Sequence, residues 1–262
     1  MEIIVCVKQV PGSSKVEVDP VTGVLKRDAA DSKMNPYDLF ALETALRIRE
    51  QKGGRIKVVT MGPPHAKEVI REAYMMGADE GVLITDRRFG GSDVLATSYA
   101  LSQGIRKTGD FDLILCGKQT TDGDTAQVGP EMAEYLGIPH IANVLKILEI
   151  KERSMIVEMD MPDTVEMVEI KLPCLLTVEK DIYQPRLPSF IKKLSTKDKD
   201  IRLISLNEFD DRDEKKYGLS GSPTQVEKIF PPLVNQDRES WTGDPDSLSL
   251  KIAEKLRQLK FI

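Results

Sequence analysis

The sequence has few of the residues on which metal sites, disulfides and acid–base catalysis depend. It contains three cysteines, Cys6, Cys116 and Cys174, which are widely spaced in apolar stretches, and two histidines that each stand alone. An odd, scattered set of cysteines indicates neither a disulfide framework nor a zinc site. We therefore expect no metal site and no catalytic side chain, and we interpret the cysteines as small buried residues of a protein in a reducing cytoplasm.

Long apolar runs and a strong positive charge are also missing. No run approaches the roughly 18 residues that span a bilayer, and the opening MEIIVCVKQV lacks the basic region of a signal peptide. The net charge of −5 argues against nucleic-acid binding. With 40% apolar and 30% charged residues, the composition indicates a globular cytoplasmic protein with no membrane span.

The first half of the chain alternates between apolar strand-like runs and helical patterns. Asn35 is the expected N-cap of the first helix and Pro36 its first residue. Such alternation predicts an α/β fold with a doubly wound, mostly parallel, Rossmann-like sheet. The expected strands cover 3–10, 55–62, 81–85 and 111–117, and the expected helices cover 36–50, 66–77, 92–107, capped by Ser92, and 125–136.

The pattern changes after Gly137 to alternation of apolar and polar residues, which predicts antiparallel strands. A polar, turn-rich stretch follows, and an amphipathic helix closes the chain. We expect a nucleotide-binding domain over residues 1–183 and an extended arm over 184–262 that packs on a partner chain. The expected antiparallel strands are Val144–Ile150, Met155–Met161, Thr164–Lys171 and Cys174–Val178.

An unusually long polar loop, within CGKQTTDGDTAQVGPEMAEYLG (116–137), follows the apolar run FDLIL. Strand-to-helix loops usually have about two to six residues. Glycines, hydroxyls and a helix N-terminus together suit a phosphate or pyrophosphate, although an elaborate cap without a ligand is the alternative. Asp122 and Asp124 would repel phosphate, so we assign them to capping, loop hydrogen bonds or a ribose hydroxyl. Lys8 and Lys118 are either phosphate contacts or solvated charges.

The common fingerprints of nucleotide-binding proteins and hydrolases are missing. The chain has no GxGxxG after its first strand, no GxxxxGK[ST] and no GxSxG. A stand-alone nucleotide-binding protein or hydrolase stays open as one interpretation, but it would need a base, nucleophile or metal cluster that the sequence does not show.

Several blocks resemble the β subunit of electron transfer flavoproteins. CGKQTTDGDTAQVGPEMAEYLG is similar to the signature of that family, and VKQVP, KMNPYDLFALETAL and MGPPHAKEVIREAYMMGAD resemble further blocks in the same order. The resemblance implies an obligate heterodimer with an α subunit. It also implies nucleotide contacts at Cys6, Asn35, Pro36, Tyr37, Asp38, Met61, Gly117, Lys118, Gln119, Thr120, Thr121, Asp122, Gly123, Asp124, Thr125, Ala126, Gln127 and Val128.

Members of this family differ in the ligand of the β site. Simple electron carriers hold AMP there as a structural ligand, whereas electron-bifurcating members hold FAD, which exchanges hydride with NADH. The hairpin VDPVTGVLKRD (Val18–Asp28), in which Arg27 is a candidate NAD contact, and the segment DGDTAQVGP resemble the bifurcating branch. This resemblance implies FAD and NAD(H), ferredoxin or flavodoxin as the low-potential acceptor, and a role in anaerobic metabolism.

A short stretch, PRLPSFIKK, resembles the loop with which family members dock on a dehydrogenase. Leu187 matches the anchoring leucine, although the lead-in to it is shorter than usual. The resemblance implies a partner such as an acyl-CoA dehydrogenase or a reductase. The alternative is that Leu187 packs on the α subunit as an ordinary residue of the arm.

Overall fold

The computed structural model describes residues 1–12, 32–227 and 238–262. These residues divide into two compact units, Met1–Gln225 and Val226–Ile262. The hairpin expected at Val18–Asp28, with Arg27, lies outside the described residues.

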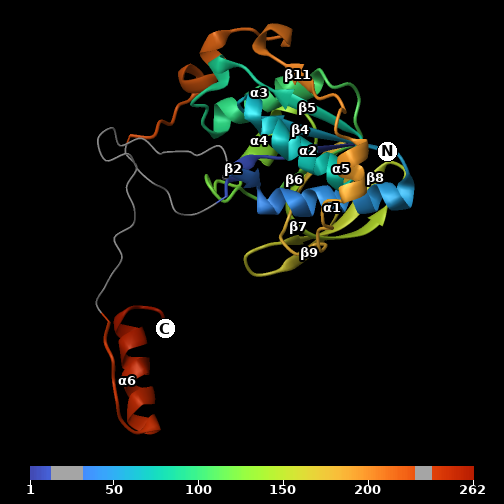
Figure 1. The fold of residues 1–262 in the computed structure, drawn as a ribbon. Coiled ribbons are helices and arrows are strands. Elements are labelled where there is room, and N and C mark those ends of the chain that lie inside the picture. The colour runs from blue at the N-terminus through green and yellow to red at the C-terminus, as the bar shows by residue number, and fades with distance from the viewer. Residues whose placement is uncertain (13–31, 228–237) are drawn as a thin grey trace. The chain divides into compact units, whose positions relative to one another are not determined.

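The first unit is built on one large sheet (Figure 1). Its nine described strands lie in the order β11-β5-β4-β1-β6-β10-β7-β8-β9, and β2 (Gln9–Pro11) pairs separately with β3 (Ser32–Met34) in antiparallel fashion. This sheet confirms the predicted fold class. Its strands are β1 (Glu2–Cys6), β4 (Arg55–Met61), β5 (Glu80–Ile84), β6 (Leu113–Gly117), β7 (His140–Ile150), β8 (Ser154–Asp160), β9 (Val165–Lys171), β10 (Cys174–Val178) and β11 (Arg202–Ile204).

Helices cover both faces of this sheet. Ile3 and Val5 belong to the core beneath α1 (Pro36–Lys52) and α2 (Lys67–Met76), and Ile4 belongs to the core beneath α3 (Val94–Arg106) and α4 (Val128–Leu136). A strand buried on both faces reads as a continuous apolar run, which explains the sequence of β1. The short 3₁₀ helices are η2 (Pro64–Ala66), η3 (Arg87–Phe89), η4 (Leu206–Glu208), η5 (Glu214–Lys216) and η6 (Gly218–Gly221).

The prediction that β10 is antiparallel was wrong. This strand lies between β6 and β7 and runs parallel to both. All five residues of CLLTV are buried, as befits an interior strand of a parallel sheet. The antiparallel pairing of β7 with β8 and of β8 with β9 confirms the rest of that prediction.

Residues 179–225, which follow β10, pack against other parts of the first unit. Helix α5 (Phe190–Ser195) lies against α2, and β11 pairs in parallel with β5. Phe209 and Tyr217 are buried, and their rings pack on Phe89 with centroid distances of 5.4 and 5.7 Å. These aromatic contacts explain why the first unit extends to Gln225, beyond the boundary expected at residue 184.

The second unit contains α6 (Pro245–Gln258), which buries none of its side chains. Asp244 caps this helix by accepting a hydrogen bond from the backbone N–H of Ser247 at 2.9 Å. Apolar side chains such as Leu250 and Phe261 are 72% and 74% exposed. Across the described part of the chain, the structure contains no helix with the length and apolar character needed to cross a membrane.

Candidate functional site

The order of the strands defines a switch point at the carboxyl edge of the sheet. From β1 the chain moves to β4 and β5 on one side, and then crosses back to β6 on the other side of β1. Ligands of open α/β sheets bind where the strand order reverses in this way. The candidate site therefore lies beyond the ends of β1 and β6, where Cys6 and Cys116 are neighbours in register.

The structure brings most of the predicted site residues to this edge. Cys6 ends β1, Met61 ends β4, and residues 35–38 lie at the start of α1. The long loop between β6 and α4, residues 117–128, is tied to the start of α1 by hydrogen bonds. Leu187 lies elsewhere, between β10 and α5.

Asn35 holds the long loop in place. Its side-chain N–H donates to the carbonyl oxygen of Gln119 at 2.8 Å, and its side-chain oxygen accepts from the backbone N–H of Thr121 at 3.2 Å. Asn35 is the N-cap residue of α1, as predicted, and its carbonyl oxygen accepts from the backbone N–H of Asp38 at 3.0 Å, but its side chain makes no capping bond. The residue is fully buried, so these bonds replace the water contacts that the amide and the loop backbone lose on folding.

Asp38 joins three segments under the site. Its carboxylate accepts from the backbone N–H of Lys8 at 2.7 Å, from the side chain of Asn35 at 2.9 Å and from the backbone N–H of Gly117. Burial outweighs these donors and raises the pKa of Asp38 to about 7. Only glycine fits at position 117, because an added Cβ would lie 2.5 Å from the Asp38 carboxylate and 2.6 Å from the backbone of Tyr37.

The raised pKa of Asp38 predicts a pH-dependent stability. The unfolded carboxyl group titrates near pH 4, so the protonated form contributes stability that is complete below about pH 4 and is lost as the pH rises through about 7. We expect the free energy of unfolding to fall over this window by up to about 4 kcal/mol from this group. Urea unfolding of wild type and of Asp38→Asn at several pH values measures the slope. Equal slopes in the two proteins would show that Asp38 is not responsible.

The two aspartates of the loop make loop contacts and do not cap α4. Asp122 accepts from the Lys8 ammonium and from the backbone N–H of Gly123, both at 2.8 Å, and Asp124 accepts from the side chain of Gln119. Burial would raise the pKa of Asp122, but Lys8 outweighs it and lowers that pKa. Loop hydrogen bonds are one of the alternatives that the sequence left open for both aspartates. The ammonium of Lys8 is thus paired with the Asp122 carboxylate.

Two further polar groups at the edge are already paired. The Lys118 ammonium binds the Glu179 carboxylate, and this hydrogen bond raises the pKa of Lys118. Hydrogen bonding to Cys6 and burial raise the pKa of Cys116 well above its usual value. Cys116 therefore stays a protonated thiol at neutral pH, which does not suit a nucleophile.

Helix α4 begins later than the sequence predicted. It starts at Val128, not at Thr125, and Gln127 precedes it without a side-chain cap. Asp124 and Ala126 have φ angles of 53° and 56°, which residues other than glycine adopt at a cost and which interrupt helical geometry. The first N–H groups of a helix have no acceptor within it, and at α4 they include those of Val128 and Gly129.

This arrangement fits the phosphate end of a nucleotide. N–H groups without an acceptor in the helix and the positive end of the α4 dipole favour an anion, and residues 121–125 at the turn of the loop are exposed to solvent. Among the described residues, an added Cβ at Gly123 would meet nothing closer than 3.5 Å, so no described residue crowds the turn. Neutral donors and a helix start can thus hold phosphate without a dedicated positive charge.

Fold and site together define an α/β protein with a candidate anion site at the switch point of its sheet, and comparison with known proteins gives the family. A sequence model described as the electron transfer flavoprotein domain matches residues 22–208. The chain is 45% identical over 262 residues to the electron transfer flavoprotein subunit beta of Clostridium acetobutylicum, covering 100% of both chains. It is 43% identical over 258 residues to the protein of the same name from Thermoanaerobacterium thermosaccharolyticum, covering 98% of both.

A third relative carries a more specific name. The chain is 41% identical over 261 residues to the caffeyl-CoA reductase-Etf complex subunit CarD of Acetobacterium woodii, covering 97% of this chain and 99% of the relative. The chain belongs to the electron transfer flavoprotein family, as a β subunit.

Proposed function

We propose that this chain is the β subunit of an electron-bifurcating electron transfer flavoprotein. In this proposal the site at the ends of β1 and β6 holds FAD. The bound FAD would accept hydride from NADH. Electrons then divide between a low-potential acceptor, ferredoxin or flavodoxin, and a partner dehydrogenase reached through the FAD of the α subunit. The observation that carries the proposal is the loop of residues 117–128, with its small residues, at the switch point of the sheet.

The residues of this chain would bind and orient the nucleotides. The first N–H groups of α4 would hold the pyrophosphate, and Asn35 and Asp38 would keep the loop in the shape that exposes those groups. Hydride transfer between two stacked cofactors needs close positioning and no protein acid or base. This requirement agrees with the absence of an activated thiol at Cys116.

Assembly with an α subunit completes the proposed complex. Helix α6 buries none of its side chains. Ile252, within the helix, is 50% exposed, and Leu259, the residue after it, is 54% exposed. Because exposed apolar groups of this size favour burial against another surface, we propose that residues 245–262 pack on the α subunit.

An AMP-binding β subunit without bifurcation is the alternative function. Acid release of the nucleotides from the purified αβ heterodimer, followed by chromatography, distinguishes the two. We expect two FAD per heterodimer and no AMP. One FAD and one AMP per heterodimer would assign this chain a structural and docking role.

Leu187 is the proposed anchor for the partner dehydrogenase, and its removal is the first test of docking. Its side chain is 87% exposed, so Leu187→Ala should leave the fold intact. A buried apolar anchor contributes about 2 kcal/mol or more to binding, so the apparent KM for the dehydrogenase should rise more than tenfold. NADH oxidation with a dye acceptor should stay unchanged. Equal loss of both activities would indicate a folding role.

A further inference from the structure

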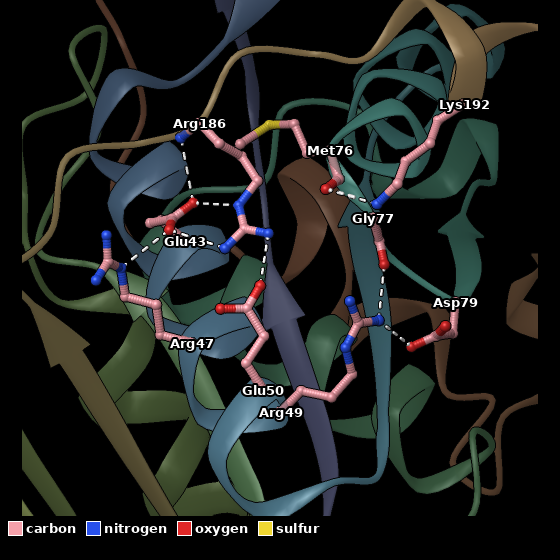
Figure 2. A network of polar contacts seen from close by, with 9 residues as sticks. All are labelled: Glu43, Arg47, Arg49, Glu50, Met76, Gly77, Asp79, Arg186 and Lys192. Carbon is pink, nitrogen blue, oxygen red and sulfur yellow. Dashed lines mark hydrogen bonds and ion pairs between the residues drawn. The ribbon is translucent and has the colours of Figure 1, made fainter.

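Residues 184–195 form the segment that carries Leu187. This segment is attached to the rest of the first unit on both sides of that residue. Figure 2 shows Arg186 reaching two glutamates of α1, and Lys192 reaching the end of α2. Leu187 lies between these attachments and is itself almost fully exposed.

The first attachment is centred on a buried carboxylate. Arg186 donates to Glu43 from its backbone N–H at 3.2 Å, from Nε at 2.8 Å and from Nη2 at 3.0 Å. The Glu43 side chain is only 2% exposed, against 32% for that of Arg186. Burial would raise the pKa of Glu43, but hydrogen bonds from Arg186 outweigh it and lower that pKa. The pair is thus charged and joined by parallel hydrogen bonds, and its carboxylate is buried, which makes it strong.

Neighbouring groups reinforce this pair. Arg186 Nη1 donates to Glu50 at 2.8 Å, and Arg47 Nε donates to Glu43 at 3.0 Å. The Arg47 guanidinium also lies 4.7 Å from the ring centre of Tyr183, at the start of the segment. A guanidinium over a tyrosine face is attractive. Helix α1 therefore holds the segment through a network of four charged residues.

The second attachment uses the end of α2. The backbone N–H of Ser189 donates to the carbonyl oxygen of Met75 at 3.0 Å, and the Lys192 ammonium donates to that of Met76 at 3.3 Å. Carbonyl groups at a helix C-terminus lack intrahelical partners and favour a cation. Both contacts orient α5, which buries none of its side chains.

The attachments hold a segment that displays apolar side chains to solvent. Leu187, Phe190, Ile191 and Leu194 are 87%, 71%, 78% and 63% exposed. Apolar packing does not hold these residues, so their position depends on the polar contacts. Fixing a binding segment before its partner arrives removes part of the entropy cost of association.

We propose that Arg186 is a positioning residue that, through Glu43, fixes residues 184–195 on α1 and so sets how readily a partner dehydrogenase docks on the exposed apolar side chains. The inference rests on the proposed docking function, to which it adds the device that presents Leu187. Arg186 itself need not contact the partner.

The test uses the αβ heterodimer with Arg186→Gln and Arg186→Lys, and Glu50→Gln as the control. In Arg186→Gln, amide hydrogen exchange of residues 187–195 should become at least about tenfold faster. The apparent KM for an acyl-CoA dehydrogenase should rise about tenfold, while NADH oxidation with a dye acceptor is unchanged. Lysine keeps the charge without the fork and should give a smaller change in both measurements. Glu50→Gln removes the charge of one exposed partner of Arg186 and should resemble wild type.

Three outcomes would overturn the proposal. Unchanged exchange of residues 187–195 in Arg186→Gln would show that the pair does not fix the segment. Faster exchange with an unchanged KM would show that fixing the segment does not matter for docking. A parallel loss of dye-linked NADH oxidation would show a general structural role. If the wild-type heterodimer transfers no electrons to the dehydrogenase, the proposed docking function is wrong. The exchange data then decide separately whether Arg186 fixes the segment.

Discussion

Asn35→Leu should reduce nucleotide affinity by roughly ten- to a hundredfold. Asn35 is fully buried, and its amide bonds the carbonyl oxygen of Gln119 and the backbone N–H of Thr121. Leucine has a similar size but would leave both partly buried loop groups without their partner, and an unsatisfied polar group costs up to about 1–3 kcal/mol when it is fully buried. Calorimetric titration of the nucleotide-free heterodimer with FAD and with AMP measures the loss.

A matched substitution separates this effect from a general loss of stability. Gln103 on α3 is 9% exposed, and its side-chain oxygen has no hydrogen-bond partner within the described residues. Gln103→Leu makes the same exchange of an amide for an apolar group, away from the loop, and should leave nucleotide affinity at the wild-type value. Wild-type affinity in Asn35→Leu would show that this residue does not organise the site.

Gly117→Ala should disrupt the site through crowding. The added Cβ would lie 2.5 Å from an oxygen of Asp38 and 2.6 Å from the backbone carbonyl carbon of Tyr37. The Asp38 carboxylate bonds two backbone segments, so it cannot move without breaking them. Overpacking of this kind costs about 1–3 kcal/mol. We expect a lower free energy of unfolding in urea and a heterodimer purified with less bound nucleotide.

Gly123→Ala provides the comparison within the same loop. Of the residues that the structure describes, its added Cβ would meet only the hydroxyl of Thr120, at 3.5 Å, which is an ordinary contact. Stability should therefore change much less than in Gly117→Ala. Equal destabilisation by the two substitutions would contradict the account of Gly117.

The sequence allowed the fold class and the edge of the sheet with the site to be predicted, because both depend on local patterns. The βα alternation predicted the parallel sheet, and the long polar loop after β6 indicated a ligand site at the end of that strand. Strand β10 was assigned the wrong direction because it follows three antiparallel strands. Its continuous apolar run, CLLTV, carried the signal of an interior parallel strand.

The errors at the site arose where tertiary contacts override local preferences. Asn35 followed by Pro36 has the local pattern of a helix cap, and Asn35 is the N-cap residue of α1, but its side chain binds the long loop and makes no bond to the helix backbone. The start of α4 was placed too early because positive φ angles at Asp124 and Ala126 are not visible in the sequence. Sequence reasoning also missed Glu43, although an acid three residues before Leu46 on the apolar face of α1 is a sign of a buried partner.

Anaerobic titration of the αβ heterodimer with NADH tests the central proposal most directly. The account predicts that the heterodimer contains two FAD and that one of them is reduced rapidly by two electrons at the first equivalent of NADH. A heterodimer that contains AMP and a single FAD, and that does not react with NADH, would contradict it.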